Sequence, residues 1–136
     1  MNEIKIFTDG GARGNPGPAA VGIVIFSDEK KIAQIKKCIG TATNNIAEYS
    51  AVLEALEYLA KEDSVNEAEF FLDSELVVKQ LNGVYKVKDP KLKELFWQIK
   101  QKICELKLQT SFTHVPREQN KQADALVNEA LDEKTG

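Results

Sequence analysis

The sequence predicts an α/β protein built on a mixed five-stranded sheet that is covered by helices. Short apolar runs rich in β-branched residues, which are typical of strands, occur in both halves of the chain. Between them lie segments in which apolar residues recur at helical spacing. The predicted order of elements is βββαβααβα, and three successive strands followed by alternating helices and strands indicate a mixed sheet.

The five predicted strands are recognised by different patterns. The first alternates, with Ile4 and Ile6 facing one way, and it ends in two glycines, whereas the second is a dense β-branched run. A short turn over residues 28–31 makes the second and third strands an antiparallel pair, so the first three strands form a meander. The predicted ranges are Glu3–Thr8, Ala20–Phe26, Ile32–Ile39, Ala68–Leu72 and Leu108–Val115.

The four predicted helices are marked by apolar spacing and by residues that begin or end them. Asn45 is a good N-cap for the first helix, and Pro90 is well placed to open the third, whose apolar residues form one face as far as Leu106. Asn82 and Gly83 close the second helix. The predicted helices are Ile46–Leu59, Ser74–Leu81, the helix that Pro90 opens, and Asn120–Leu131.

Length and composition describe one ordinary globular domain over residues 1–136. The apolar fraction of 43% and the charged fraction of 29% are typical of such domains. No stretch approaches the ~18 to 20 apolar residues of a membrane helix, and the start of the chain lacks a signal-peptide pattern, so we expect a cytoplasmic protein with no membrane contact. The net charge of −3 argues against a generally basic nucleic-acid binder.

Four carboxylates are the most informative feature of the chain. Asp9 and Asp73 end apolar runs, whereas Glu48 and Asp124 lie near the starts of predicted helices. Acids placed in this way can converge at one edge of a sheet, where they repel one another unless a hard cation holds them. Ligation by oxygen alone suits Mg²⁺ or Mn²⁺, and such a site is the usual protein half of metal-assisted phosphoryl transfer.

Each acid, taken singly, also has a structural explanation. The spacing of Asn45 and Glu48 matches a capping box, and Asp73 precedes a helix that it could cap. Asp9 precedes two glycines and could belong to a turn, and Asp124 could be an exposed helix acid. These explanations weaken when all four acids must also coincide with their flanking residues.

Positive charge is concentrated in one segment of this acidic chain. Residues 79–107 hold eight lysines against three acids. Such a segment is a plausible track for a phosphate backbone. A solvated helix face is the alternative for Lys100, Lys102 and Lys107.

Four motifs, taken in order, closely resemble those of type 1 ribonucleases H. Any one of them is weakly specific, but the ordered set is specific and spans nearly the whole chain. The resemblance implies a ribonuclease H-like fold with helices on both faces of the sheet, in the compact form that lacks a long basic protrusion. The motifs are Phe7–Ala19, Thr43–Glu48, Leu72–Ser74 and Val115–Asp124.

The resemblance implies an endonuclease that hydrolyses the RNA strand of RNA–DNA hybrids, leaving 5′-phosphate and 3′-hydroxyl ends. It assigns Asp9, Glu48, Asp73 and Asp124 as ligands of two Mg²⁺ ions, with Asp9 shared by both and Mn²⁺ as a possible substitute. Two-metal catalysis of an in-line displacement follows, without a side-chain nucleophile. Beside the acids, Arg117 or His114 would assist product release.

The substrate contacts also come from the matched motifs. Backbone amides of the glycine-rich segment would approach a phosphate or ribose, carboxamides would contact 2′-hydroxyls, and a threonine would help seat a DNA phosphate. An aromatic residue with two lysines would lie against the DNA strand. Plain helix capping is the alternative for Asn44 and Asn45, and Glu75 stands where many relatives have a glutamine. The assigned residues are Gly10, Gly11, Asn15, Thr43, Asn44, Asn45, Tyr85, Lys86 and Lys88.

Two alternatives to this function remain open. One keeps the metal nuclease and adds double-stranded RNA as a substrate. The other is a catalytically silent nucleic-acid-binding module, which the intact acid quartet disfavours because a binder gains nothing from mutually repelling carboxylates. We expect a monomer whose partner is the hybrid itself.

Overall fold

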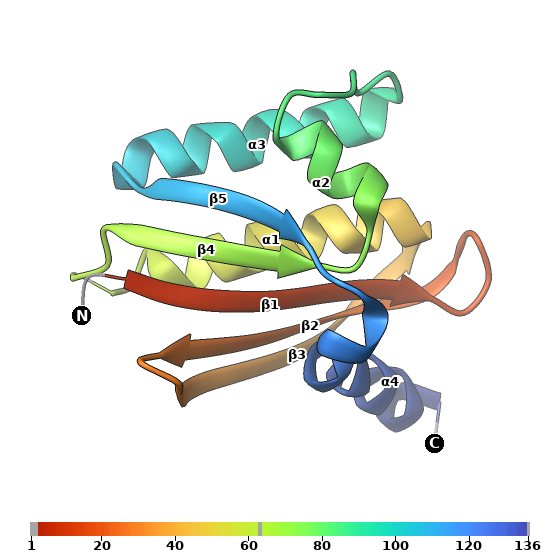
Figure 1. The fold of residues 1–136 in the computed structure, drawn as a ribbon. Coiled ribbons are helices and arrows are strands. Elements are labelled where there is room, and N and C mark those ends of the chain that lie inside the picture. The colour runs from red at the N-terminus through yellow and green to blue at the C-terminus, as the bar shows by residue number, and fades with distance from the viewer. Residues whose placement is uncertain (1–2, 63, 136) are drawn as a thin grey trace.

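The computed structural model, which describes residues 3–62 and 64–135, is a five-stranded mixed sheet with helices on both faces (Figure 1). The predicted fold class and order of elements are therefore confirmed. A short 3-10 helix, Arg117–Gln119, precedes the last α-helix and was not predicted. The elements are β1 Glu3–Ala12, β2 Gly17–Ser27, β3 Lys30–Ala42, α1 Asn44–Leu59, β4 Glu67–Leu72, α2 Glu75–Leu81, α3 Pro90–Leu106, β5 Gln109–His114 and α4 Lys121–Thr135.

The strands lie in the order β3-β2-β1-β4-β5, so β1 is at the centre of the sheet. The first three strands form the predicted antiparallel meander, and β4 and β5 extend the sheet in parallel. Asp28 and Glu29 form the two-residue turn between β2 and β3, with φ values of 50° and 66°. Positive φ at both residues is what a tight hairpin with the natural strand twist requires.

Two apolar layers hold the helices to the sheet. The larger one joins Ile6 of β1, Leu56 of α1 and Ile99 of α3, all fully buried. On the opposite face, Val24 of β2 packs against Leu126 at the sheet-facing side of α4. Figure 1 shows α1 and α3 together behind the sheet and α4 alone in front of it.

Two glycines allow the helices to approach the strands closely enough to place their acids. A Cβ atom at Gly10 would lie 2.1 Å from the carbonyl oxygen of Ala47 in α1, and one at Gly22 would lie 2.2 Å from that of Ala123 in α4. Real Cβ atoms cannot approach a carbonyl so closely, so the helix backbones rest directly on β1 and β2. The residues that follow Ala47 and Ala123 in sequence are the acids Glu48 and Asp124.

Two local predictions are wrong. β1 runs on to Ala12, so Gly10 and Gly11 lie in a paired strand and the loop begins after them. Thr43, not Asn45, is the N-cap of α1: its hydroxyl accepts the N–H of Ile46 at 3.2 Å, and Asn45 lies inside the first turn. Within the described ranges, no helix has the length and apolar character needed to cross a membrane.

Candidate metal centre

Three of the four acids meet beside the central strand. Asp9 comes from β1, Glu48 from the second turn of α1, and Asp73 directly follows β4. Each offers one carboxylate oxygen, and these oxygens all lie within 4.8 Å of one another. Asp9 and Glu48 are only 5% and 7% exposed, whereas Asp73 is half-buried.

The fourth acid lies beside this group. Asp124 is in the first turn of α4, and its carboxyl is close enough to Asp9 to help raise the pKa of that group. The amide of Asn128, one turn further along α4, donates to the backbone carbonyl of Asp124 at 3.2 Å. The structure therefore brings together all four acids that the sequence singled out.

Burial and mutual repulsion make this cluster costly when it is fully charged. The pKa of Asp9 is raised to about 8, first by desolvation and then by the charge of Asp73 and the neighbouring carboxyl of Asp124. Desolvation also raises the pKa of Glu48 well above its ordinary value, and the charges of Asp9 and Asp73 add to this. The Arg117 guanidinium acts in the opposite direction on both groups.

The cluster fits a hard divalent cation. All of its donors are carboxylate oxygens, which suit Mg²⁺ or Mn²⁺ rather than zinc or copper. A bound cation would also offset the repulsion that raises the pKa of Asp9.

The structure rules out the purely structural explanations, helix capping or a turn, for three of the acids. Ser74, not Asp73, caps α2, since its hydroxyl accepts the N–H of Val77 at 3.3 Å. Glu48 accepts the N–H of Gly10 at 3.0 Å and so is tied to β1 rather than to a capping box. Asp9 lies within a paired strand, not in a turn.

Asn120 is a component of the site that sequence reasoning did not single out. Its side chain is 1% exposed, and its amide nitrogen donates to the carbonyl of Thr8 at 2.9 Å and to Oδ2 of Asp73 at 3.3 Å. Its Oδ1 and the hydroxyl of Thr8 are buried without a partner among the described residues. The only sequence signal was its place in the last motif, four residues before Asp124.

The two candidates for product release are placed differently. Arg117 is exposed on the 3-10 helix, near enough for its charge to lower the pKa values of Asp9 and Glu48. His114 is exposed at the end of β5, opposite Leu72, and within the described residues it forms no hydrogen bond or ion pair with the acids.

The asparagines of the predicted substrate surface brace the loop between β1 and β2. Oδ1 of Asn44 accepts the N–H of Ala12, and Oδ1 of Asn15 accepts the N–H of Asn44, both at 2.9 Å. These bonds connect the loop to the start of α1, so capping does not explain Asn44. The N–H of Gly10, predicted to approach a phosphate, is already donated to Glu48.

The basic segment separates into paired and exposed lysines. Lys100 is partly buried and donates to the carbonyl of Leu81 at 2.7 Å, and burial lowers its pKa. Lys102 pairs with Glu57 at 3.4 Å. Lys86 and Lys88 are exposed on the connection between α2 and α3 and have no ion pair among the described residues. Lys100 and Lys102 therefore have local structural contacts, whereas Lys86 and Lys88 remain free to contact a phosphate backbone.

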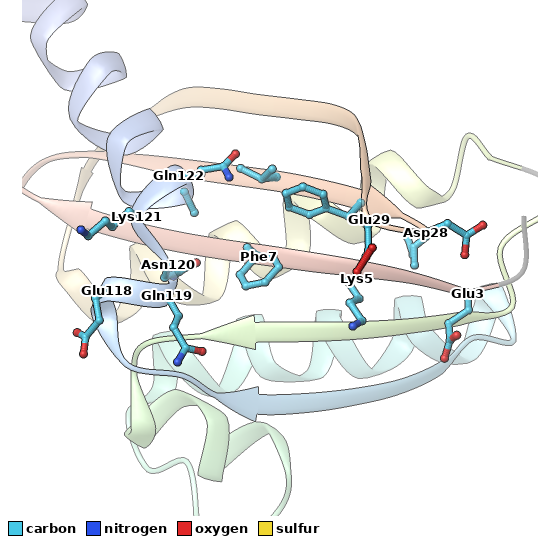
Figure 2. Close-up of a pocket in the computed structure, with 14 residues that line it drawn as sticks. Glu3, Lys5, Phe7, Asp28, Glu29, Glu118, Gln119, Asn120, Lys121 and Gln122 are labelled. Atoms are coloured by element: carbon cyan, nitrogen blue, oxygen red, sulfur yellow. The ribbon is translucent and has the colours of Figure 1, made fainter.

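A cavity of about 640 Å³ lies over β1, β2 and the start of α4 (Figure 2). Phe7, Phe26 and residues at the start of α4 line it, and none of the four acids does. Asn120 is the residue that connects the wall of this cavity to the acids.

Comparisons with known proteins agree with this arrangement. The model of a family described as reverse transcriptase-like matches residues 7–130. Ribonuclease HI of Halobacterium salinarum is 44% identical, covering 96% of this chain and 65% of the relative. Ribonuclease H of Clostridium botulinum is 33% identical over 98% of both chains. The chain spans 36% of the length of the mycobacterial proteins that it matches at 39% identity.

Solved structures of RNase H1 proteins are also similar to this chain. The crystal structure of LC11-RNase H1 in complex with an RNA/DNA hybrid is similar with a TM-score of 0.93 and 47% identity, covering 98% of this chain and 99% of that one. RNase H1 from Halobacterium salinarum has a TM-score of 0.91 and 44% identity, over 97% and 99% of the two chains.

The sheet order and the converging acids define a protein of the ribonuclease H-like class. Because the family model covers most of the chain and the clostridial relative matches over its whole length, the chain belongs to the type 1 ribonuclease H family.

Proposed function

We propose that this protein is an endoribonuclease that hydrolyses the RNA strand of RNA–DNA hybrids, leaving 5′-phosphate and 3′-hydroxyl ends. The observation that carries the proposal is the cluster of Asp9, Glu48 and Asp73, whose oxygens lie within 4.8 Å of one another beside Asp124. Further support comes from the similarity to LC11-RNase H1, whose structure was solved with an RNA/DNA hybrid.

The four acids would hold two Mg²⁺ ions, with Mn²⁺ as a possible substitute and Asp9 as the shared ligand. When bound, such ions supply activation of the attacking water and stabilisation of the leaving oxygen. The chain's own part is to fix the ligands. The N–H of Gly10 holds Glu48, the amide of Asn120 holds Asp73, and the first turn of α4 presents Asp124.

The substrate surface that we propose begins at the braced loop. Because Asn15 and Asn44 use their oxygens on backbone N–H groups, their NH₂ groups are left to donate to a 2′-hydroxyl or to a base in the minor groove. Asn45 would add a third carboxamide. Thr43 accepts a hydrogen bond as the helix cap and retains its own O–H to donate to a DNA phosphate.

Further contacts would lie on either side of this loop. Gly11 would offer close backbone approach, and Tyr85, with Lys86 and Lys88, would contact the DNA strand. For product release we favour Arg117 over His114, since its charge acts on Asp9 and Glu48. We retain a monomeric state and a cytoplasmic location as proposals drawn from the sequence.

A cleavage assay tests this proposal. End-labelled RNA–DNA hybrid, double-stranded RNA and double-stranded DNA are each incubated with Mg²⁺, Mn²⁺ or a chelator. Cleavage of the hybrid that requires the metal is expected, with 3′-hydroxyl ends on the products. Comparable cutting of double-stranded DNA would overturn the proposal. Cutting of double-stranded RNA would extend the substrate range, and metal-independent binding without cleavage would instead indicate the silent module.

A further inference from the structure

Asn120 lies at the start of α4, but its side chain does not cap that helix. Its backbone carbonyl accepts the N–H of Asp124 at 3.1 Å, so the first turn of α4 starts from this residue. An asparagine at a helix start usually caps the free N–H groups with its side-chain oxygen. Here that oxygen has no partner among the described residues, and the amide nitrogen donates to Thr8 and Asp73 instead.

This one side chain connects three of the elements that carry acids. Thr8, whose carbonyl it binds at 2.9 Å, precedes Asp9 in β1. Asp73, bound at 3.3 Å, follows β4, and Asp124 lies one turn along α4 from Asn120 itself. This single carboxamide therefore connects the segments that carry Asp9, Asp73 and Asp124, in addition to the strand pairing and helix packing that bring them together.

The chemistry of this place suits asparagine more than other polar residues. The carbonyl of Thr8 and the carboxylate of Asp73 both need a hydrogen-bond donor from the same neutral side chain, and an amide NH₂ supplies two. An aspartate would add another carboxylate about where the present 3.3 Å bond to Asp73 lies, and a serine has one donor only. A buried Oδ1 without a hydrogen-bond partner in the described part of the chain lowers the stability of the fold, which is expected where geometry at a functional site takes precedence over stability.

We infer that Asn120 is a positioning residue of the nuclease site. Its amide fixes the rotation of the Asp73 carboxylate by holding Oδ2, which leaves Oδ1 as the oxygen for a cation. Its bond to Thr8 also fixes the distance between β1 and the start of α4. The inference rests on the proposed function for its catalytic consequence, but its effect on metal binding can be measured without any nucleic acid.

Calorimetric titration of Mn²⁺ into metal-free protein is the central measurement. In Asn120→Ala the affinity should fall by about 10- to 100-fold, as is usual when a group that orients a ligand is lost. The turnover number on the hybrid should fall by a similar factor of about 10 to 100, with the Michaelis constant within about twofold. Asn82→Ala is the matched control, because it removes an asparagine amide that donates to the carbonyl of Phe112 at 3.0 Å, away from the acids. Its metal affinity should stay at the wild-type value.

A double-mutant cycle decides whether Asn120 acts through Asp73. If it does, adding Asn120→Ala to Asp73→Asn should produce little further loss of metal affinity, whereas independent effects would add. Should Asn120→Ala fail to fold, Asn120→Ser, which keeps one donor, is titrated in its place. Wild-type metal affinity in the Asn120 variant, or full additivity in the cycle, would overturn the inference. Wild-type protein that binds Mn²⁺ but leaves the hybrid intact would overturn the proposed function alone.

Discussion

The backbone N–H of Gly10 donates a hydrogen bond of 3.0 Å to Oε1 of Glu48. Gly10 directly follows Asp9, so the backbone beside one acid of the cluster holds the side chain of another. The contact exists because Gly10 has no side chain between β1 and α1. Any Cβ atom there would overlap the carbonyl of Ala47. Close packing of a helix on a strand, rather than a flexible loop, thus sets the position of Glu48.

Gly10→Ala should therefore destabilise the protein severely. The added methyl would lie 2.1 Å from a backbone oxygen that cannot move without shifting α1, so we expect a loss of about 3 kcal/mol or more in the free energy of unfolding. Urea denaturation measures this. Gly11→Ala is the matched control, because its Cβ would meet only Val127 at 3.5 Å, an ordinary contact, and its stability should stay within about 1 kcal/mol of wild type. Equal effects at the two glycines would contradict the packing argument.

Asp9→Asn should abolish cleavage and also change how stability depends on pH. The pKa of Asp9 is raised from 3.8 to about 8 in the folded protein. Between these values the folded state holds a proton that the unfolded state has lost, so stability falls as pH rises through this window. One such group contributes at most about 1.4 kcal/mol per pH unit. In metal-free protein, Asp9→Asn should show a shallower fall than wild type.

Thermal unfolding from pH 4 to 8, with and without Mg²⁺, checks this prediction. Added Mg²⁺ should raise the melting temperature of wild type at pH 8 and have little effect on Asp9→Asn. Asp28→Asn, which changes an exposed acid in the turn between β2 and β3, is the control and should keep the wild-type slope. Activity of Asp9→Asn within about tenfold of wild type would remove Asp9 from its assigned role, since the loss of metal positioning should cost far more.

Thr43→Ala and Asn45→Ala should separate helix capping from substrate contact. Thr43 provides the cap hydroxyl, so its loss should lower the free energy of unfolding by about 1 kcal/mol. Asn45 is not the cap, so Asn45→Ala should leave the melting temperature nearly unchanged and raise the Michaelis constant for the hybrid if its amide contacts a 2′-hydroxyl. Melting temperature and Michaelis constant are measured on the same preparations. A large loss of stability in Asn45→Ala would mean that the cap has been assigned to the wrong residue.

The convergence of the acids could be predicted from the sequence because its signals are local. Asp9 and Asp73 follow apolar runs, and β4 lies parallel to β1, which brings the two strand ends to one edge of the sheet. The N-cap was missed because three adjacent polar residues compete for it, and Asn44 is diverted to the N–H of Ala12, 32 residues away. Asn120 was missed because its hydrogen-bond partners are also distant in sequence: one lies in β1 and the other directly after β4. Contacts of this kind leave no periodic signal in the chain.

The last prediction concerns the exposed lysines of the connection between α2 and α3. If Lys86 and Lys88 each contact a DNA phosphate, each should contribute roughly 0.7 to 0.9 to the slope of log affinity against log salt concentration. Changing both to Gln should then reduce the slope by about one to two and raise the Michaelis constant for the hybrid. Turnover at saturating substrate should barely change, since the acids are untouched. Hybrid binding measured across a salt series tests this directly.

Two controls make the outcome specific to this segment. Changing Lys30 and Lys31 to Gln removes the same charge from the exposed start of β3 and should leave the slope at its wild-type value. Tyr85→Ala should weaken binding with little change in slope, because a ring against a sugar contributes by burial rather than by charge. Tyr85 is 46% exposed, and its ring lies 5.1 Å from Nζ of Lys79. A wild-type slope in the Lys86 and Lys88 double variant would place the DNA strand elsewhere, because two phosphate contacts cannot be lost without releasing fewer counterions.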